Sequence, residues 1–496
     1  MFISGDLSIA IFEKSGIMEE KSNFGGMFMT LKEQIRNWMA GREDEFVEAL
    51  TLLIAVNSVT GEAAPGMPFG PGPAKALELA LELARKWGMS TWEDEGYVGL
   101  ADLNDKEDLL HILAHLDIVA AGDHWDTDPF ILTRDGDLIY GRGTDDDKGP
   151  AVASLLAMRC IKELGIPLKG NVKLILGTDE ESGSKDLQHY FAAHPFAPYS
   201  ITPDTCFPVT NVEKATYGPK FSKTWDVQSE MANQLLSLKG GIRVNVAPGN
   251  CTAKIRTLTA DDAAAAMAEV SACSGVNFAA SEENGILTIE ATGVQAHASR
   301  PYEGKNAITA MLELLRKLPL AEDAATQTVR ELNKLFPYGD NDGAALGIAM
   351  EDEVAGKTTV TLSLLEIGET GFAAQFDSRD SLSATPENTK EVVEKVFANL
   401  GWSCTGEFNP AHVVDGNSPF VKILLDTYEE FSGRKGYCEA IGGGTYVHHI
   451  PGGVAYGAGE HDFPSYLHGP NERARISQLL LTAEIYAAVI ARICGE

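Results

Sequence analysis

The sequence predicts an α/β fold in which a mostly parallel mixed sheet is flanked by helices and an α+β domain is inserted. Two short, largely apolar runs, Leu109–Ala114 and Val172–Gly177, have the pattern of buried strands in such a sheet. Helical patterns alternate with them. The length of 496 residues exceeds the usual size of one domain. From about Glu213 the pattern changes, which indicates the inserted domain.

Helices frame these strands in the first half of the chain. Leu31–Val56 has helical spacing of apolar residues, and Ala74–Trp87 forms a second helix that stops at a glycine. A third helix runs over Pro150–Leu164, with proline in its first turn and Gly165 just beyond its end. The resulting order is strand, acidic turn, helix.

The second half predicts the insert and a return to the first domain. The insert is expected to contain the helices Asp261–Ala272 and Asn306–Leu318 and the strands Gly285–Thr292, Thr358–Leu365 and Phe372–Phe376. Three more helices are expected over Glu387–Leu400, Phe420–Phe431 and Glu472–Ile493. Four parts are predicted. Residues 1–26 form an N-terminal extension, for which disorder is left open. Residues 27–213 and 412–496 form the principal domain, and residues 214–411 form the insert between them.

Composition narrows the classes of partner. A net charge of −31 argues against nucleic acid, because the field repels phosphate and no basic stripe is present. Seven cysteines form no close CxxC pair, so neither a disulfide framework nor a thiolate metal site is predicted, and a reducing cytoplasm is expected. No apolar run approaches the ~20 residues that a membrane span needs. The partners expected are therefore small molecules.

Acidic clusters follow both predicted strands and indicate a metal site. His115-Leu116-Asp117 ends the first strand, Thr178–Ser182 (TDEES) ends the second, and Gly141–Pro150 (GRGTDDDKGP) lies between them. A solvated acidic turn explains either cluster alone. Together, histidine and hard oxygen ligands favour Zn²⁺, with Mn²⁺ or Co²⁺ as alternatives, over Ca²⁺ or Mg²⁺. So many carboxylates suggest two ions that share one carboxylate, an arrangement suited to hydrolysis.

The ordered motifs resemble those of a known enzyme superfamily. They comprise His115-Leu116-Asp117, Gly143–Pro150, Thr178–Ser182, Pro203-Asp204-Thr205, Ala296-His297-Ala298-Ser299 and His468–Glu472. This set resembles the dinuclear-zinc aminoacylase and carboxypeptidase G superfamily, and within it the bacterial dipeptidase V (PepV-like, carnosinase-related) branch. The match runs from about Leu31 to the C-terminus. It implies a catalytic domain and a lid domain, which correspond to the principal domain and the insert.

The resemblance also implies a role for each residue of the metal centre. Asp146 would bridge two Zn²⁺ ions and be joined to Asp147 by a cis peptide bond. The remaining ligands would be His115 and Asp204 for one ion and Glu181 and His468 for the other. Asp117 would orient His115, and Glu180 would be the general base. His461 is the main alternative to His468, because Glu460-His461-Asp462 could also bind a metal.

In the lid, the resemblance implies groups that bind the substrate. His297 would stabilise the oxyanion, and Asn245 would contact the substrate. Arg379 would bind the substrate's terminal carboxylate, which suits the planar guanidinium; the simpler alternative is a surface arginine paired with Asp377 or Asp380. The backbone of Gly443, Gly444 and Thr445 could line the same pocket, since glycine permits close approach.

The function predicted is hydrolysis of dipeptides with a free terminal carboxylate. An N-acyl-amino-acid deacylase or desuccinylase would use the same metals and base. A catalytically silent zinc-binding sensor is a third reading, against which Glu180 argues, because binding alone needs no base beside the ligands. The long insert favours a monomer, with a dimer left open. No membrane partner is expected.

Overall fold

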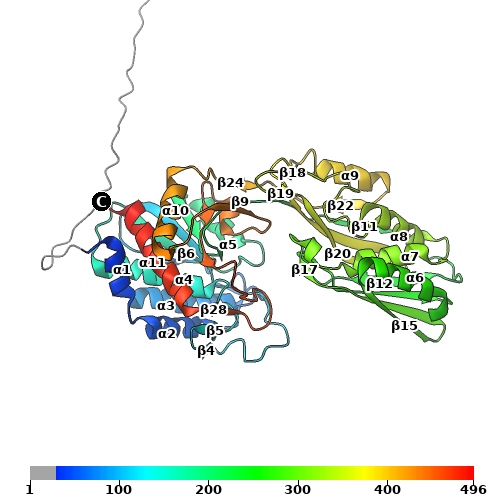
Figure 1. Ribbon diagram of the computed structural model, residues 1–496, viewed down its shortest axis with the longest axis horizontal. Coiled ribbons are helices and arrows are strands. Elements are labelled where there is room, and N and C mark those ends of the chain that lie inside the picture. The colour runs from blue at the N-terminus through cyan, green and yellow to red at the C-terminus, as the bar shows by residue number, and fades with distance from the viewer. Residues whose placement is uncertain (1–28) are drawn as a thin grey trace, which may run out of the picture. The chain divides into compact units, whose positions relative to one another are not determined.

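The computed structural model describes residues 29–496, which divide into two compact units. Among the described residues, unit 1 comprises residues 29–193, 426–435 and 462–496, and unit 2 comprises residues 194–425 and 436–461. The predicted N-terminal extension, residues 1–26, lies outside the described residues. The predicted domain boundaries remain a prediction. Figure 1 labels the helices and strands of both units.

The principal strands of unit 1 have the order β1-β2-β6-β3. Their bounds are Ser90–Asp94, Val98–Asp102, Asn171–Gly177 and Asp108–His115 respectively. The two predicted strands, β3 and β6, pair in parallel, whereas β1 and β2 add antiparallel neighbours. This confirms the predicted mixed α/β sheet. Because β3 and β6 run in parallel, the loops that follow them emerge at the same edge.

Helices pack around these strands. Their bounds are α1 Leu31–Met39, α2 Glu43–Ile54, α3 Pro71–Lys86, α4 Lys148–Leu164, α5 Lys185–Ala193 and α11 Ile476–Cys494. The single helix predicted over Leu31–Val56 is wrong, because the chain breaks between α1 and α2 at Gly41, where φ is +79°. Such a backbone conformation ends a helix and favours glycine. Figure 1 shows α11 running beside α4, against which it packs.

The last helix, α11, is long and apolar enough to span a membrane by length and composition alone. It has a mean hydropathy of 1.5 over its apolar window, and 61% of that window is buried inside the protein. Core helices meet the same criterion. Its contacts with α4 and α1 are those of a core helix.

A small sheet fixes the start of α11 beside the acidic loop. Strand β28 (Arg473–Arg475) pairs with β5 (Leu138–Tyr140), which pairs with β4 (Thr133–Asp135). Arg473 therefore lies opposite Tyr140, so that residue 472 faces the turn that begins at Gly141. The small sheet brings two segments together that are more than 300 residues apart in sequence.

Unit 2 contains a first group of short strands in the order β7-β26-β9-β24, with β25 parallel to β9. Their bounds are Tyr199–Thr202, Val454–Ala455, Val209–Glu213, His412–Val413 and Cys438–Ile441. Strand β8 (Thr205–Cys206) pairs with β27 (Ala458–Gly459). The 3-10 helices η1 and η2 of unit 2 cover Pro301–Glu303 and Tyr446–His449, whereas helix α10 (Pro419–Ser432) has residues in both units.

The larger sheet of unit 2 has the order β15-β16-β14-β12-β20-β21-β10-β23, with β11 and β22 beside β21. The bounds are β10 Ala215–Tyr217, β11 Lys220–Thr224, β12 Leu235–Gly240, β14 Asn250–Arg256, β15 Asn277–Glu283, β16 Ile286–Thr292, β20 Thr359–Gly368, β21 Gly371–Asp380, β22 Ser403–Thr405 and β23 Phe408–Asn409. Two further antiparallel pairs are β13 (Val246–Ala247) with β17 (Ala296–His297), and β18 (Glu351–Asp352) with β19 (Gly356–Lys357).

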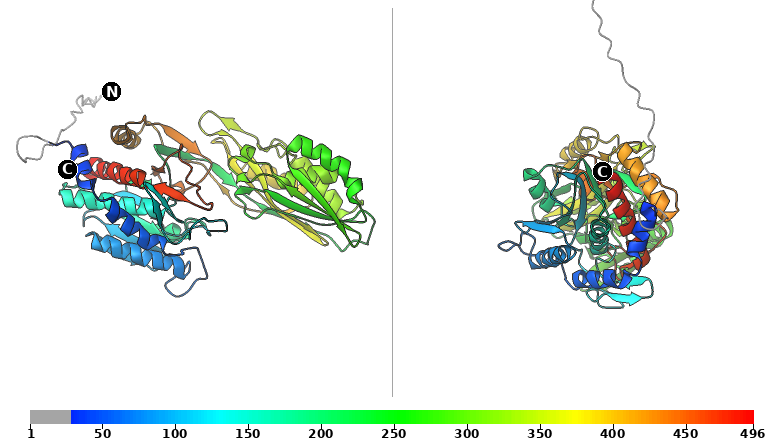
Figure 2. Two further views of the ribbon diagram at one scale, coloured as in Figure 1. Left: turned by 60° about the horizontal axis from the view of Figure 1, so that its bottom comes forward. Right: turned by 90° about the vertical axis from the view of Figure 1, so that its left-hand side faces the viewer.

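Helices cover one face of this sheet and form the core of unit 2 with it (Figure 2). They are α6 Ala260–Ser274, α7 Ala307–Lys317, α8 Ala324–Leu335 and α9 Lys390–Asn399. Helix α7 contacts β14, β16 and β20, and it begins where the Asn306 side chain accepts hydrogen bonds from two backbone N–H groups. Phe221, Phe372, Phe397 and Trp402 form an aromatic cluster within this core.

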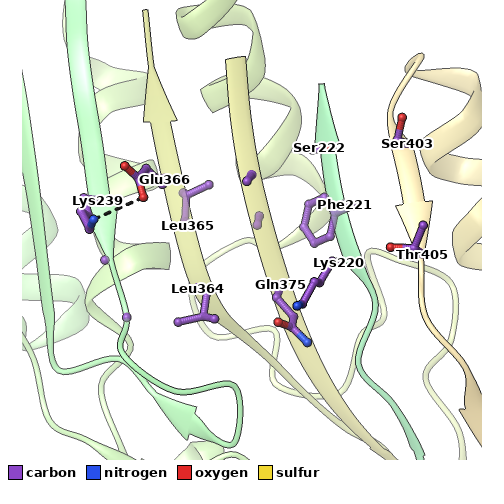
Figure 3. Close-up of a pocket in the computed structure, with 14 residues that line it drawn as sticks. Lys220, Phe221, Ser222, Lys239, Leu364, Leu365, Glu366, Gln375, Ser403 and Thr405 are labelled. Carbon is purple, nitrogen blue, oxygen red and sulfur yellow. Dashed lines mark ion pairs between the residues drawn. The ribbon is translucent and has the colours of Figure 1, made fainter. Parts of the chain in front are cut away.

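The other face of the sheet bears a hollow of about 490 Å³ (Figure 3). Strands β11, β12, β20, β21 and β22 line it, with polar side chains such as Lys220 and Gln375. Lys239 and Glu366 form an ion pair of 3.3 Å across two neighbouring strands there. The residues predicted to form a functional site do not line this hollow.

Asp380, the last residue of β21, is a buried carboxyl whose titration should influence stability. Burial raises its pKa to about 7, despite the hydrogen bond that the Ser378 hydroxyl donates at 2.8 Å. Because the folded pKa exceeds the unfolded value, the folded state loses stability as pH rises from about 4 to about 7, by ~1.4 kcal/mol per unit.

We therefore expect Asp380→Asn to stabilise unit 2 more at pH 8.5 than at pH 5.5, by roughly 2 kcal/mol. Urea unfolding at the two pH values, followed by tryptophan fluorescence, measures this difference. Asp226→Asn, which removes the same charge from an exposed position, is the control. An equal gain at both pH values would contradict the prediction.

Candidate functional site

The acidic motifs of unit 1 gather at one edge of its sheet. His115 ends β3 and pairs in register with Gly177, which ends β6. The segments that follow, Leu116-Asp117 and Thr178–Ser182, therefore leave the sheet side by side. The sequence predicted this arrangement from the two apolar runs and their acidic ends. This edge is where open α/β sheets bind ligands.

Asp146 lies between two histidines. One of its carboxylate oxygens is 2.8 Å from His115 Nε2, and the other is 2.8 Å from His468 Nε2. Glu181 Oε1 lies 3.1 Å from the same His468 nitrogen, so Asp146, Glu181 and His468 form a group that could hold an ion. The predicted cis peptide bond between Asp146 and Asp147 is confirmed. A carboxylate that faces one histidine with each oxygen has the geometry of a bridging ligand.

His115 and Glu180 also lie close to each other at this edge of the sheet. A ring nitrogen of His115 and a carboxylate oxygen of Glu180 lie within 4.8 Å of each other. His115 Nδ1 lies 3.0 Å from the backbone carbonyl oxygen of Asp117, which fixes the ring. The Asp117 carboxylate is 3.4 Å from that nitrogen and accepts the backbone N–H groups of Glu180 and Glu181, each at 3.1 Å. Asp117 thus positions both the histidine and the loop that bears the predicted base.

The electrostatics of this edge favour a cation. Burial raises the pKa of Glu180 well above its usual value, and the carboxylates of Glu181, Asp117 and Asp146 raise it further. Burial opposes protonation of His468, but its hydrogen bonds to Asp146 and Glu181 raise the pKa of His468 to about 10. Glu181 Oε1 is buried and faces His468 Nε2 at 3.1 Å. This combination of histidines and surplus carboxylates fits divalent zinc, manganese or cobalt ions.

Glu472 holds the acidic loop in place, a role that was not predicted although Glu472 ends the motif His468–Glu472. Its carboxylate accepts the backbone N–H groups of Gly143, Asp145 and Asp146 at 3.0, 3.0 and 3.2 Å. It also forms a buried salt bridge of 2.5 Å with Arg142. Both side chains are almost completely buried. The position of Asp146 therefore depends on Glu472.

Unit 2 gathers the residues predicted to bind substrate. His297, which is exposed, lies on β17 opposite Val246 of β13, and Asn245 immediately precedes that strand. The backbone N–H of Ala298 donates to the Asn245 carbonyl oxygen at 2.8 Å. His297 Nδ1 and the Ser299 hydroxyl lie 2.7 Å apart. Asn245 and His297 are therefore neighbours, as the predicted lid site requires.

Arg379 lies beside the turn formed by Gly442-Gly443-Gly444-Thr445, the glycine turn. Its guanidinium donates two hydrogen bonds to Asp377, of 2.7 and 2.8 Å, and one of 2.8 Å to the carbonyl oxygen of Gly442. The alternative reading predicted the pairing with Asp377, but Arg379 is largely buried rather than a surface residue. A Cβ atom on Gly442 would lie 2.6 Å from the Cβ of Ser299, so only glycine fits here. The turn, the arginine and the His297 segment thus form one cluster within unit 2.

Two further predicted residues lie in unit 2. Asp204 follows β7 and immediately precedes β8, and its role as a metal ligand remains a prediction. His461, the alternative ligand, is exposed and lies 2.9 Å from Glu439 Oε1. Among the described residues, His461 belongs to no group that could hold an ion.

Comparison with known proteins identifies the family. The model of peptidase family M20/M25/M40 matches residues 111–492, which span the acidic motifs and the glycine turn. The chain belongs to this family. As an M20 peptidase it is a metallopeptidase that hydrolyses peptide bonds, which confirms the resemblance drawn from its motifs.

Relatives of this M20 peptidase align over nearly their whole length. YtjP of Bacillus subtilis, which is assigned as a dipeptidase by inference, is 31% identical over 462 residues, covering 92% of this chain and 99% of YtjP. A protein of Staphylococcus aureus (strain USA300) with the same inferred assignment is 29% identical over 474 residues, covering 94% and 99%.

Solved structures share the fold of this M20 peptidase. Human carnosine dipeptidase 1 superposes with a TM-score of 0.54 at 15% identity, covering 93% of this chain and 99% of that one. The dipeptidase Dug1p of Saccharomyces cerevisiae gives a TM-score of 0.57 at 15% identity, covering 92% and 98%. These likenesses confirm the predicted fold class.

Proposed function

We propose that the protein is a zinc-dependent dipeptidase that requires a free C-terminal carboxylate on its substrate. The observation that carries this proposal is the placement of Arg379 beside the glycine turn, with Asp377 fixing its guanidinium. Planar guanidinium donors and backbone N–H groups are suited to bind a carboxylate. A group that binds the terminus of the substrate limits the length of peptide that fits. The names of the bacterial relatives support the same activity.

The predicted metal ligands and the predicted base would carry the hydrolysis. Asp146 would bridge the two ions, with His115 and Asp204 on one and Glu181 and His468 on the other. When bound, the ions would activate a water molecule as a nucleophile and polarise the scissile carbonyl. Glu180 would accept the proton of that water and pass it to the leaving amine.

Residues of unit 2 would recognise the substrate. The exposed imidazole of His297 would donate a hydrogen bond to the carbonyl oxygen as negative charge develops there. Asn245 would contact the substrate beside it, and Arg379 would bind the terminal carboxylate with Gly443, Gly444 and Thr445. We further propose that the protein acts as a cytoplasmic monomer on small peptides, without nucleic-acid or membrane partners.

A substrate panel tests this function. The zinc-loaded protein would be assayed with α- and β-alanyl dipeptides, the corresponding dipeptide amides, tripeptides and N-acyl amino acids. We expect cleavage of free dipeptides, with kcat/KM at least about 100-fold lower for the amides, because a neutral amide cannot make the charge-assisted hydrogen bonds that the terminal carboxylate would accept.

The other outcomes would replace the proposal. Preferential cleavage of N-acyl amino acids would identify a deacylase or desuccinylase with the same metal centre. Zinc binding without turnover of any compound would identify a sensor. Equal cleavage of dipeptides and longer peptides would show that Arg379 does not limit substrate length.

A further inference from the structure

The glycine turn of unit 2 is held from within the protein by a single carboxylate. Glu213, the last residue of β9, is 1% exposed. One of its oxygens accepts the backbone N–H of Thr445 at 3.2 Å and the Thr445 hydroxyl at 2.7 Å. The other lies 2.9 Å from His448 Nδ1. Since a carboxylate can only accept, His448 carries its proton on Nδ1 in this contact.

The strand pairing places Glu213 directly beside the turn. Glu213 of β9 is in register with Ile441 of β25, the residue that immediately precedes Gly442. Thr445 begins the 3-10 helix η2, which carries His448. The Glu213 carboxylate therefore ties both the end of the turn and the following helix to the sheet.

These contacts leave the middle of the turn accessible. In the part of the chain that the structure describes, no hydrogen bond is made by the backbone N–H of Gly443 or Gly444. Gly444 is exposed and Gly443 is half-buried. Arg379 binds the carbonyl oxygen of Gly442 on one side, while Glu213 binds Thr445 on the other. The turn is thus fixed at both ends with two donors free between them.

We infer that Glu213 and His448 are positioning residues that set the glycine turn for recognition of the substrate's terminal carboxylate. This inference rests on the proposed dipeptidase function. A buried carboxylate is stable only when donors surround it, and His448 supplies one of the three donors here. Loss of that donor would let the Glu213 carboxylate and Thr445 shift. Such a shift moves the open N–H groups of Gly443 and Gly444 relative to Arg379.

The effect should appear in binding rather than in the chemical step. Glu213 and His448 contact the turn and do not belong to the group of Asp146, Glu181 and His468. A displaced turn weakens binding of a carboxylate in the substrate and in the transition state alike, which raises KM and leaves kcat nearly unchanged. A neutral terminal amide binds less strongly to the turn, so a displaced turn affects its KM less. The ratio of the KM values for the free dipeptide and its amide therefore reports whether Glu213 and His448 act on recognition of the carboxylate.

The test compares a free dipeptide and its amide in the zinc-loaded full-length protein. For His448→Ala we expect KM for the free dipeptide to rise about 10-fold, with little change for the amide, as for loss of one charge-assisted hydrogen bond. His448→Asn should recover most of the loss, because its amide N–H can occupy the place of Nδ1. Glu213→Gln should behave like His448→Ala. His449→Ala, the exposed neighbour in the same 3-10 helix, should match wild type.

Each outcome has a distinct meaning. A merely structural role for the pair would lower the melting temperature of His448→Ala and leave the ratio of the two KM values unchanged, which would overturn the inference. Equal loss in His448→Asn and His448→Ala would overturn it as well. If wild type cleaves no dipeptide, the proposed function fails first, and the inference falls with it.

Discussion

Replacing Glu180 by glutamine should lower kcat for dipeptides by about 10³-fold, because the variant cannot accept the proton of the attacking water. Glutamine has nearly the same shape, and the backbone N–H of Glu180 keeps its hydrogen bond to Asp117. The loop should therefore retain its conformation. Steady-state kinetics together with zinc content by atomic absorption measures both properties.

The zinc content of the variants distinguishes a general base from a metal ligand. Glu180 lies close enough to His115 that its carboxylate could contact an ion directly. If Glu180 acts as the base, Glu180→Gln keeps its zinc, whereas the neighbouring variant Glu181→Gln loses affinity for one ion. Loss of zinc in both variants would assign Glu180 to the ligands and require another base. Unchanged kcat in Glu180→Gln would remove it from the mechanism.

The positions of the metal-centre motifs were predictable because their signals are local. Leu109–Ala114 and Val172–Gly177 are short apolar runs, and the acidic residues that follow each run lie at the carboxyl ends of β3 and β6. Parallel pairing of two such strands places their ends together whatever the rest of the chain does. The lid helix α7 was predicted within one residue at each end, because Asn306 and Leu318 bound its amphipathic pattern.

Other features could not be predicted because their determinants lie far apart in the sequence. Arg142 and Glu472 are separated by 330 residues, and neither has a local pattern that marks the pair. Glu213 and His448 are 235 residues apart. Edge strands such as β1 and β15 carry alternating or mostly polar residues, which gives weak strand signals. The break at Gly41 was missed because apolar spacing continues on both sides of it.

Replacing Glu472 by glutamine should lower the free energy of unfolding of unit 1 by about 3–5 kcal/mol, the usual cost of removing one partner from a buried ion pair. Arg142 and Glu472 are 1% and 0% exposed, so solvent cannot replace the lost charge. Glu472 Oε1 accepts the N–H groups of Gly143, Asp145 and Asp146, and Oε2 faces Arg142, so glutamine must turn its NH2 group toward one of these donors. Urea unfolding of the metal-free protein, monitored by circular dichroism, measures the change.

The same variant should also lose metal affinity, because the N–H of Asp146 is one of the donors that Glu472 binds. A shift in this loop displaces the carboxylate that lies between His115 and His468. Glu43→Gln is the matched control, since Glu43 pairs with Arg134 on the surface and exposed pairs contribute at most ~1 kcal/mol. If Glu472→Gln were as mild as Glu43→Gln, the buried pair would not be what positions the loop.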